Sequence, residues 1–251
     1  MLVLSLFPGI GLLDMAFELE GFCVVRGPDV LWGGDVRRFH PPAGKFDGVI
    51  GGPPCQAFSR LAHMVRQNGL QPKFGNLVPE FERCVTEAQP SWFVMENVPD
   101  APRPAVNGYE VFPFFLNLRW CKDENGNPCK VNRLRAWSFG MKGEYRVLAI
   151  QTATFENMEY ECAATGGSAR PIAIGGSDRV KKFRDGKGAM PWNAKSGAAV
   201  EELCRKQGLP EGFLKHVPFT VEAKCKAIGN GVPLPMGRAI ARAVKEAMEV
   251  A

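Results

Sequence analysis

The chain has 251 residues and a mass of 27.5 kDa, which is enough for one large domain or one domain with a small appendage. Its formal net charge of +5 is compatible with a polyanionic partner but is too mild to identify one. Eight scattered cysteines and three histidines favour neither a zinc site nor a disulfide framework, and no apolar stretch is long enough to span a bilayer. Because the N-terminus also lacks the charged region of a signal peptide, we expect an intracellular protein without metal.

Strands and helices are predicted to alternate through the first hundred residues. Residues 10–20 and 78–89 have apolar positions at helical spacing. Short apolar runs typical of buried parallel strands lie at residues 2–7, 22–25, 46–50 and 92–95. This alternation predicts an α/β fold with a doubly wound parallel sheet and helices on both faces.

The pattern changes in the second half of the chain. An apolar run at 110–118 is followed by a turn at 123–128, and residues 137–139 and 145–154 alternate like antiparallel strands. Residues 166–197 are rich in glycine and polar side chains, and we interpret them as a loop-rich insert. Two further helices are predicted at 198–207 and 234–248. We therefore expect a main domain over 1–150 that is completed by 216–251, with a small region at 151–215 between them.

Cys55 occupies a position at which a parallel sheet often places a reactive group. It follows the predicted strand 46–50 through the turn Gly51-Gly52-Pro53-Pro54, in which two prolines restrict the backbone. A free thiol has a pKa of about 8.5, so a nucleophilic cysteine needs positive neighbours or a helix dipole that favour the thiolate. An isolated cysteine is more often an inert core residue, but the flanking residues favour a nucleophile here.

Five motifs in chain order resemble those of the DNA cytosine-C5 methyltransferase family. The string Pro53-Pro54-Cys55-Gln56, followed by Phe58-Ser59, is similar to the catalytic motif of that family. The others are Leu6-Phe7-Pro8-Gly9-Ile10-Gly11 (cofactor loop), Glu96-Asn97-Val98 (cytosine-binding motif), Arg133-Leu134-Arg135 (paired arginines) and Gly229-Asn230-Gly231-Val232-Pro233 (closing cofactor motif). Each fragment alone is a weak signal, whereas five in order are specific. The resemblance covers nearly the whole chain except about residues 151–197, and it implies a Rossmann-like methyltransferase domain that uses S-adenosylmethionine.

The resemblance implies a catalytic set made of Cys55, Glu96, Arg133 and Arg135. Carbon 5 of cytosine is a poor nucleophile, and thiolate addition at C6 of a base flipped out of the duplex makes C5 enamine-like. In the family pattern, Cys55 makes this attack and Glu96 hydrogen-bonds the N3 and amino edge of the ring. The two arginines are implied to hold O2 and a nearby phosphate, and a spacing of i, i+2 would put both on one face of a strand. Val131 stands where the family commonly has glutamine.

A second set is implied to bind S-adenosylmethionine and to release S-adenosylhomocysteine. Glycines of the loop let the backbone approach a ligand at a strand-to-helix turn. Asp29 is our candidate for the ribose hydroxyls and Asp35 for the adenine amino group, although acids at such places are as often turn formers as ligands. Ser5 replaces an aspartate usual in the family. The predicted cofactor-binding residues are Phe7, Pro8, Gly9, Ile10, Gly11, Asp29, Asp35, Val36, Pro54, Leu77, Asn230, Gly231 and Val232.

A third set is predicted to contact double-stranded DNA. The family closes a loop over DNA after its catalytic cysteine, and it reads sequence with a variable region that here would be reduced to 151–215. Basic residues in both segments suit phosphate contacts, although a solvated basic loop would look similar. The predicted DNA-binding residues are Gln56, Ser59, Arg60, Arg66, Lys73, Arg179, Lys181, Lys182 and Arg184.

Three hypotheses about function follow. The first is a monomeric DNA cytosine-C5 methyltransferase in the cytoplasm or nucleoid of a bacterial or phage-infected cell. The second is the same chemistry on tRNA, against which the variable insert speaks. The third is an inactive DNA-binding module on the same scaffold, against which the intact catalytic set speaks. A nicotinamide oxidoreductase is a distant fourth, because nothing in that chemistry calls for the Pro-Pro-Cys-Gln turn.

Overall fold

The structure is a computed structural model that describes residues 1–54, 75–153, 161–162 and 197–249. Two compact units divide the chain. The first comprises Met1–Asn117, Leu134–Gln151 and Met236–Ala251, and the second comprises Leu118–Arg133 and Thr152–Pro235. No helix in the described ranges has the length and apolar character needed to cross a membrane.

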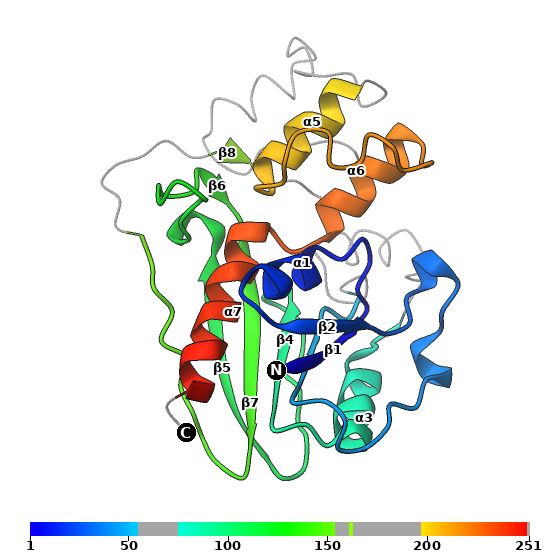
Figure 1. The fold of residues 1–251 in the computed structure, drawn as a ribbon, viewed down its shortest axis with the longest axis vertical. Helices are drawn as coiled ribbons and strands as arrows, with labels where there is room; N and C mark the ends of the chain where they lie inside the picture. The colour runs from blue at the N-terminus through cyan, green and yellow to red at the C-terminus, as the bar shows by residue number, and fades with distance from the viewer. Residues whose placement is uncertain (55–74, 154–160, 163–196, 250–251) are drawn as a thin grey trace. The chain divides into compact units, whose positions relative to one another are not determined.

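A six-stranded sheet in the order β2-β1-β3-β4-β7-β5 forms the centre of the first unit (Figure 1). Its first four strands are parallel: β1 (Leu2–Leu6), β2 (Cys23–Arg26), β3 (Gly48–Gly51) and β4 (Trp92–Asn97). Strand β7 (Leu134–Lys142) lies antiparallel between β4 and β5 (Tyr109–Asn117). The four predicted parallel strands are confirmed, as is the strand at 137–139. The predicted strand at 145–154 is wrong, since residues 143–153 form no strand.

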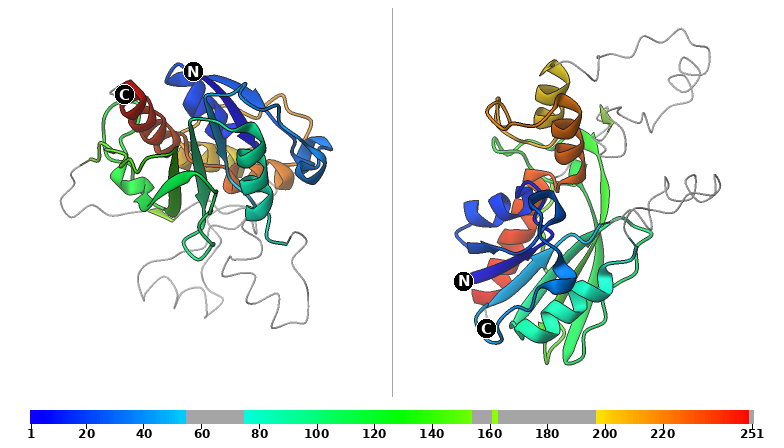
Figure 2. Two further views of the ribbon diagram at one scale, coloured as in Figure 1. Left: turned by 90° about the horizontal axis from the view of Figure 1, so that it is seen from below. Right: turned by 90° about the vertical axis from the view of Figure 1, so that its right-hand side faces the viewer.

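Helices cover both faces of this sheet. Trp92 and Phe93 are neighbours in β4 and therefore point to opposite faces. Phe17 of α1 (Leu12–Leu19) stacks on Trp92 at 6.3 Å between ring centroids, whereas Phe81 of α3 (Val78–Ala88) meets Phe93 edge-on at 5.7 Å. Figure 2 shows α3 on the face opposite α1. Helix α7 (Leu234–Glu249) lies beside α1, to which Arg238 is joined through Glu20. The predicted doubly wound fold is confirmed.

Local signals explain where α3 begins and ends. The side chain of Asn76 accepts a hydrogen bond from the amide of Val78, and a proline stands in the first turn, where its missing N–H leaves no partner unsatisfied. The helix ends at Gln89 in the left-handed conformation (φ 52°), just before Pro90. Helix α3 therefore places Phe81 and Val85 in the core under the sheet.

The second unit combines a short strand pair with two packed helices. Strand β6 (Val131–Asn132) pairs in parallel with β8 (Glu161–Cys162), and α5 (Gly197–Lys206) packs against α6 (Val221–Asn230). Thr220 caps α6 by accepting a hydrogen bond from the amide of Ala223. Helix α5 confirms the prediction at 198–207, whereas α6 was not predicted. Of the expected recognition region 151–215, the described residues 152–153, 161–162 and 197–215 belong to this unit.

Candidate active site

The carboxyl ends of β1, β3 and β4 lie at the same edge of the sheet, because these strands are parallel neighbours. The chain leaves β3 at Gly51, whose register partner on β4 is Met95, the residue before Glu96. A Cβ atom added to Gly52 would lie 3.2 Å from Oε2 of Glu96. The side chain of Asn97 donates a hydrogen bond of 3.2 Å to the carbonyl of Pro53. Glu96 therefore lies beside the turn that leads to residue 55.

Arg135 of β7 forms an ion pair with Glu96. Its Nε lies 2.9 Å from Oε1 of the carboxylate, and the side chains are 19% and 13% exposed. Nη1 of Arg135 also donates to the carbonyl of Leu134, which fixes the plane of the guanidinium. The pair lies mostly out of water but is still reachable, so Glu96 has a defined orientation and can meet a ligand.

Arg133 lies in a different setting from Arg135. It stands in the connection between β6 and β7, so the prediction that both arginines share one face of a strand is wrong. Its side chain is only 4% exposed, and Nη2 donates to the carbonyls of Gly229 (3.0 Å) and Gly231 (3.1 Å). The reason is that β7 begins only at Leu134, and the backbone carbonyl of Arg133 instead accepts from Leu118.

The loop between β1 and α1 has an unusual backbone. Phe7 (φ 57°), Gly9 (φ 56°) and Gly11 (φ 79°) all lie in the left-handed region, which is uncommon for a residue with a side chain such as Phe7. A Cβ atom at Gly9 would meet nothing within 4 Å, so the space above this residue is open. The loop is half-buried, and the open space beside Gly9 leaves room for a ligand to approach the main chain.

Two side chains that follow β2 hold the peptide groups of Gly9. Asp29 accepts from the amide of Gly9 (2.9 Å) and from that of Leu31 (2.7 Å). Trp32, which is 62% exposed, donates from Nε1 to the carbonyl of Gly9 at 2.7 Å. The contact made by Trp32 depends on the one-turn helix η1 (Val30–Trp32), and no sequence signal pointed to it.

Asp35 begins the next one-turn helix, η2 (Val36–Arg38), by accepting from the amide of Arg37. Hydrogen bonds from Arg37 lower the pKa of its carboxyl to about 2, so it is ionised at neutral pH. Val36 is buried in the core of the first unit. Asp29 and Asp35 are thus both turn formers, as the alternative interpretation held, and an ionised carboxylate retains lone pairs that can also accept from a ligand.

A buried acid beneath the loop was missed in the sequence. The hydroxyl of Ser5 donates to Asp14 of α1, whose other oxygen accepts from Nε of Arg26 at 2.9 Å. Burial raises the pKa of Asp14, while the bonds from Ser5 and Arg26 act against that rise. Glycine is favoured at position 11 because its backbone is left-handed (φ 79°), and a Cβ atom there would lie 2.7 Å from the guanidinium of Arg26. Ser5 thus holds an acid on α1.

Comparison with known proteins decides the family. A sequence model described as C-5 cytosine-specific DNA methylase matches residues 33–118. The type II methyltransferase M.NgoPII of Neisseria gonorrhoeae is 31% identical, over 99% of this chain and 96% of that protein. The chain belongs to the DNA cytosine-C5 methyltransferase family. The type II methyltransferase M.FnuDI of Fusobacterium nucleatum is 24% identical over 99% and 95% of the two chains.

The fold of this methyltransferase is also that of solved structures. The crystal structure of a Spodoptera frugiperda DNMT2 mutant has a TM-score of 0.62 and 14% identity, over 97% of this chain and 99% of that one. At this identity the likeness concerns the fold alone. It agrees with the mixed α/β sheet of the first unit.

Several predicted site residues of the methyltransferase lie outside the described residues and stay predictions. These are Cys55, Gln56, Ser59, Arg60, Arg66, Lys73, Arg179, Lys181, Lys182 and Arg184. Of the remaining cofactor candidates, Pro54 and Leu77 are half-buried, and Leu77 immediately precedes α3. Within the part of the chain that is described, no three His, Cys, Asp or Glu side chains group as a metal site.

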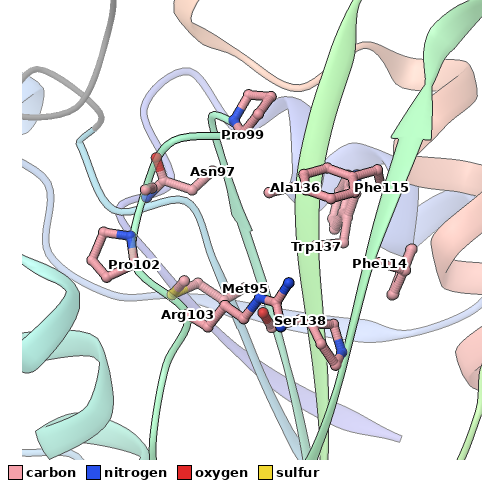
Figure 3. A pocket seen from close by; sticks show the side chains of 12 residues that line it. Met95, Asn97, Pro99, Pro102, Arg103, Phe114, Phe115, Ala136, Trp137 and Ser138 are labelled. Carbon is pink, nitrogen blue, oxygen red and sulfur yellow. The ribbon is translucent and has the colours of Figure 1, made fainter.

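A small pocket lies over β4, β7 and β5 of the methyltransferase, next to the segment that follows β4 (Figure 3). Met95 and its register partner Ser138 lie beside Arg103 in one part of it, and Phe115 lies beside its register partner Ala136 in another. Neither Glu96 nor Arg135 is among its described lining residues. This pocket is therefore not the place at which Glu96 would meet a base.

Proposed function

We propose that this chain transfers a methyl group from S-adenosylmethionine to C5 of a cytosine flipped out of double-stranded DNA. The observation that carries the proposal is the position of Glu96. Its carboxylate is held by Arg135 and adjoins Gly52, three residues before Cys55. An acid beside the turn that bears a cysteine is the arrangement that addition to C6 of a pyrimidine needs.

The proposed chemistry assigns one role to each side chain. The thiolate of Cys55 forms a bond to C6, and the electron pair of the C5–C6 double bond moves into the ring toward N3. Glu96 shares a proton with N3 and so stabilises the developing charge, while Arg135 keeps the carboxyl group oriented. Loss of the C5 proton after methylation returns the electron pair to the ring and expels Cys55 as a thiolate.

S-adenosylmethionine would be held at the loop after β1, and when bound it supplies an electrophilic methyl group. The open space above Gly9 and the left-handed backbone of Phe7 suit a ligand that lies against the main chain. Asp29 and Asp35 offer carboxylate oxygens to the hydroxyl and amino groups of an adenosyl moiety. The other cofactor contacts are proposed as the family resemblance assigns them.

DNA is proposed as the substrate, because the relatives M.NgoPII and M.FnuDI are named type II methyltransferases. The basic residues of segments 56–73 and 179–184 would contact phosphates. The short region at 151–215 would read the target, and we expect the recognised sequence to be correspondingly short. Methylation within a restriction–modification system is the role that these names favour.

A transfer assay tests the proposal. Purified full-length protein is incubated with labelled S-adenosylmethionine and either unmethylated duplex DNA or tRNA. We expect 5-methylcytosine in the DNA and its complete loss in Cys55→Ala, while Cys23→Ala, at an exposed position on β2, keeps wild-type activity. Label on adenine, on cytosine N4 or only in tRNA would contradict the proposal. Mapping the modified cytosines then identifies the target sequence.

A further inference from the structure

Two buried polar side chains of the second unit hold the C-terminal end of α6. Arg133 is 4% exposed and stands after β6, and Gln207 is 1% exposed and comes directly after α5. Both side chains donate to backbone carbonyls of residues 228–231. Residues 229–231, Gly-Asn-Gly, are the last two residues of α6 and its C-cap, and we call them the α6 turn. It belongs to the motif that resembles the closing cofactor motif of the family.

They bind carbonyls at the C-terminal end of α6, where the i+4 donors of a helix are missing, and the carbonyl of Ile228 also accepts from the amide of Gly231 at 3.1 Å. Nε2 of Gln207 lies 2.6 Å from the carbonyl oxygen of Ile228 and 3.0 Å from that of Gly231. Nη2 of Arg133 lies 3.0 Å from the carbonyl oxygen of Gly229 and 3.1 Å from that of Gly231. Both donors thus meet at Gly231, and the positive guanidinium faces the negative end of the helix dipole.

The backbone around Gln207 is itself held against the chain that follows the turn. The carbonyl of Gln207 accepts from the amide of Leu234 at 2.9 Å. Gly208 has a left-handed backbone (φ 70°), and a Cβ atom there would lie 2.6 Å from Cδ of Pro235. Only glycine fits this close approach. Gln207 is therefore fixed relative to residues 234–235, and its side chain reaches back to the other end of the turn.

These contacts use the inward groups of the α6 turn and leave its outward side accessible. Gly229 is buried, whereas Asn230 is exposed and Gly231 is half-buried. Gly229 and Asn230 are the last helical residues of α6, and at Gly231 the chain leaves the helix with an extended backbone (φ −76°, ψ 162°), a point at which glycine allows many alternatives of similar energy. Hydrogen bonds from two distant segments to the carbonyls of residues 228, 229 and 231 select one of these conformations and fix where α6 ends.

We propose that Arg133 and Gln207 are positioning residues for the cofactor: they hold the α6 turn in the conformation that binds S-adenosylmethionine. The inference rests on the proposed function, which assigns Asn230 and Gly231 to that ligand. It gives the paired arginines separate tasks, because Arg135 orients the acid that meets cytosine whereas Arg133 orients the backbone that meets the cofactor.

Binding of S-adenosylhomocysteine to full-length variants tests this proposal. Gln207→Met keeps the volume and removes both donors, and we expect about tenfold weaker binding. Arg133→Met should weaken binding by about thirtyfold, and Arg133→Lys should recover part of it through its remaining charged donor. The loss of affinity in the double variant should be smaller than the product of the losses in the two single variants, because both side chains bind the carbonyl of Gly231. In turnover, Gln207→Met should raise KM for S-adenosylmethionine while kcat and KM for DNA stay within about twofold.

A matched control separates positioning from general destabilisation. Leu203→Ala truncates a buried residue of α5, the helix that Gln207 follows, and it should lower the thermal midpoint while S-adenosylhomocysteine binding stays within about twofold. If Gln207→Met does not fold, Gln207→Glu keeps its shape, and its carboxylate can only accept. Unchanged affinity in folded Gln207 variants, or equal affinity of Arg133→Lys and Arg133→Met, would overturn the proposal. A wild-type protein that binds no S-adenosylhomocysteine would remove the proposed function as well, so the two failures are distinguishable.

Discussion

Arg133 and Arg135 are two residues apart, yet the regions around them differ in chemistry. Arg135 faces a carboxylate on the neighbouring strand of the large sheet. Arg133 donates to the carbonyls of Gly229 and Gly231 at the end of a helix. A carboxylate can exchange a proton and change its charge, whereas a backbone carbonyl cannot. The first region can thus take part in a reaction, and the second can only hold a shape.

The difference arises from where a strand begins. Arg135 belongs to β7, so its position relative to Glu96 is set by the ladder between β4 and β7. Arg133 lies one residue before β7 and belongs to the other compact unit, in which its carbonyl is bound by the amide of Leu118. A motif that looks uniform in the sequence therefore contributes to two structures.

The largest effect is expected at Glu96, the carboxylate that Arg135 faces. Glu96→Gln keeps the shape of the side chain but removes the acid, so kcat should fall by about 10²–10⁴-fold. Binding of S-adenosylhomocysteine should stay within about twofold. Single-turnover methylation and ligand titration measure the two quantities, with Glu110→Gln as the control because Glu110 is an exposed acid on the same sheet. A kcat near the wild-type value would remove Glu96 from the proposed mechanism.

A smaller effect is expected for Arg135→Lys, which sharpens the contrast with Arg133→Lys. Lysine keeps the charge but loses the planar guanidinium that pairs with Glu96 through Nε. We expect kcat to fall by about tenfold to a hundredfold, with KM for S-adenosylmethionine unchanged. Arg133→Lys should show the reverse pattern. Steady-state kinetics with S-adenosylmethionine and DNA measures these constants. If kcat and KM for S-adenosylmethionine change in the same way in both lysine variants, the two arginines do not have separate tasks.

The smallest effect is expected at an ion pair that belongs to neither region. Glu20, after α1, binds Arg238 and Arg242 of α7. Burial acts to raise the pKa of Glu20, but hydrogen bonds from Arg242 and Arg238 outweigh it, and the net shift is downward. The unfolded chain therefore binds more protons near pH 4.5. The stabilisation is present above that value and is lost as the pH falls through the lower pKa of the folded state.

Glu20→Gln should accordingly lower the free energy of unfolding by about 1 kcal/mol at pH 7 and by progressively less as the medium becomes more acidic. Denaturant titrations at several pH values measure this change. Both kcat and KM for S-adenosylmethionine should stay as in the wild type. A constant difference down to pH 3, or any change of KM, would show that this pair is not the purely structural contact that we describe.

Much of the fold could be predicted because its signals are local. Buried strands such as β3 and β4 are apolar runs, and α7 has a regular apolar face. Helix α6 was missed because its buried residues, Cys225, Ile228 and Gly229, include only one strongly apolar side chain. Packing against α5 makes it a helix. The run at 145–154 alternates like a strand, but its described residues, 145–153, form no strand.

The residues of the candidate site likewise divide into those that local sequence signals predicted and those that were missed. Glu96 and the loop of residues 7–11 were found because they directly follow predicted strands. Asp14, Trp32 and Gln207 were missed because each acts through a partner that is distant in the sequence. Nothing in the residues next to Gln207 indicates that its amide reaches Ile228.

The amino-acid sequence by itself determined the order of strands and helices, the chemical groups at the strand ends and the family to which they point. Only the tertiary structure decided which of those groups face one another, and so which arginine meets an acid and which meets a backbone turn. The physical reason is one of range. Apolar periodicity acts over a few neighbouring residues, whereas a hydrogen bond needs two atoms within about 3 Å, and for distant segments only the folded chain provides that proximity.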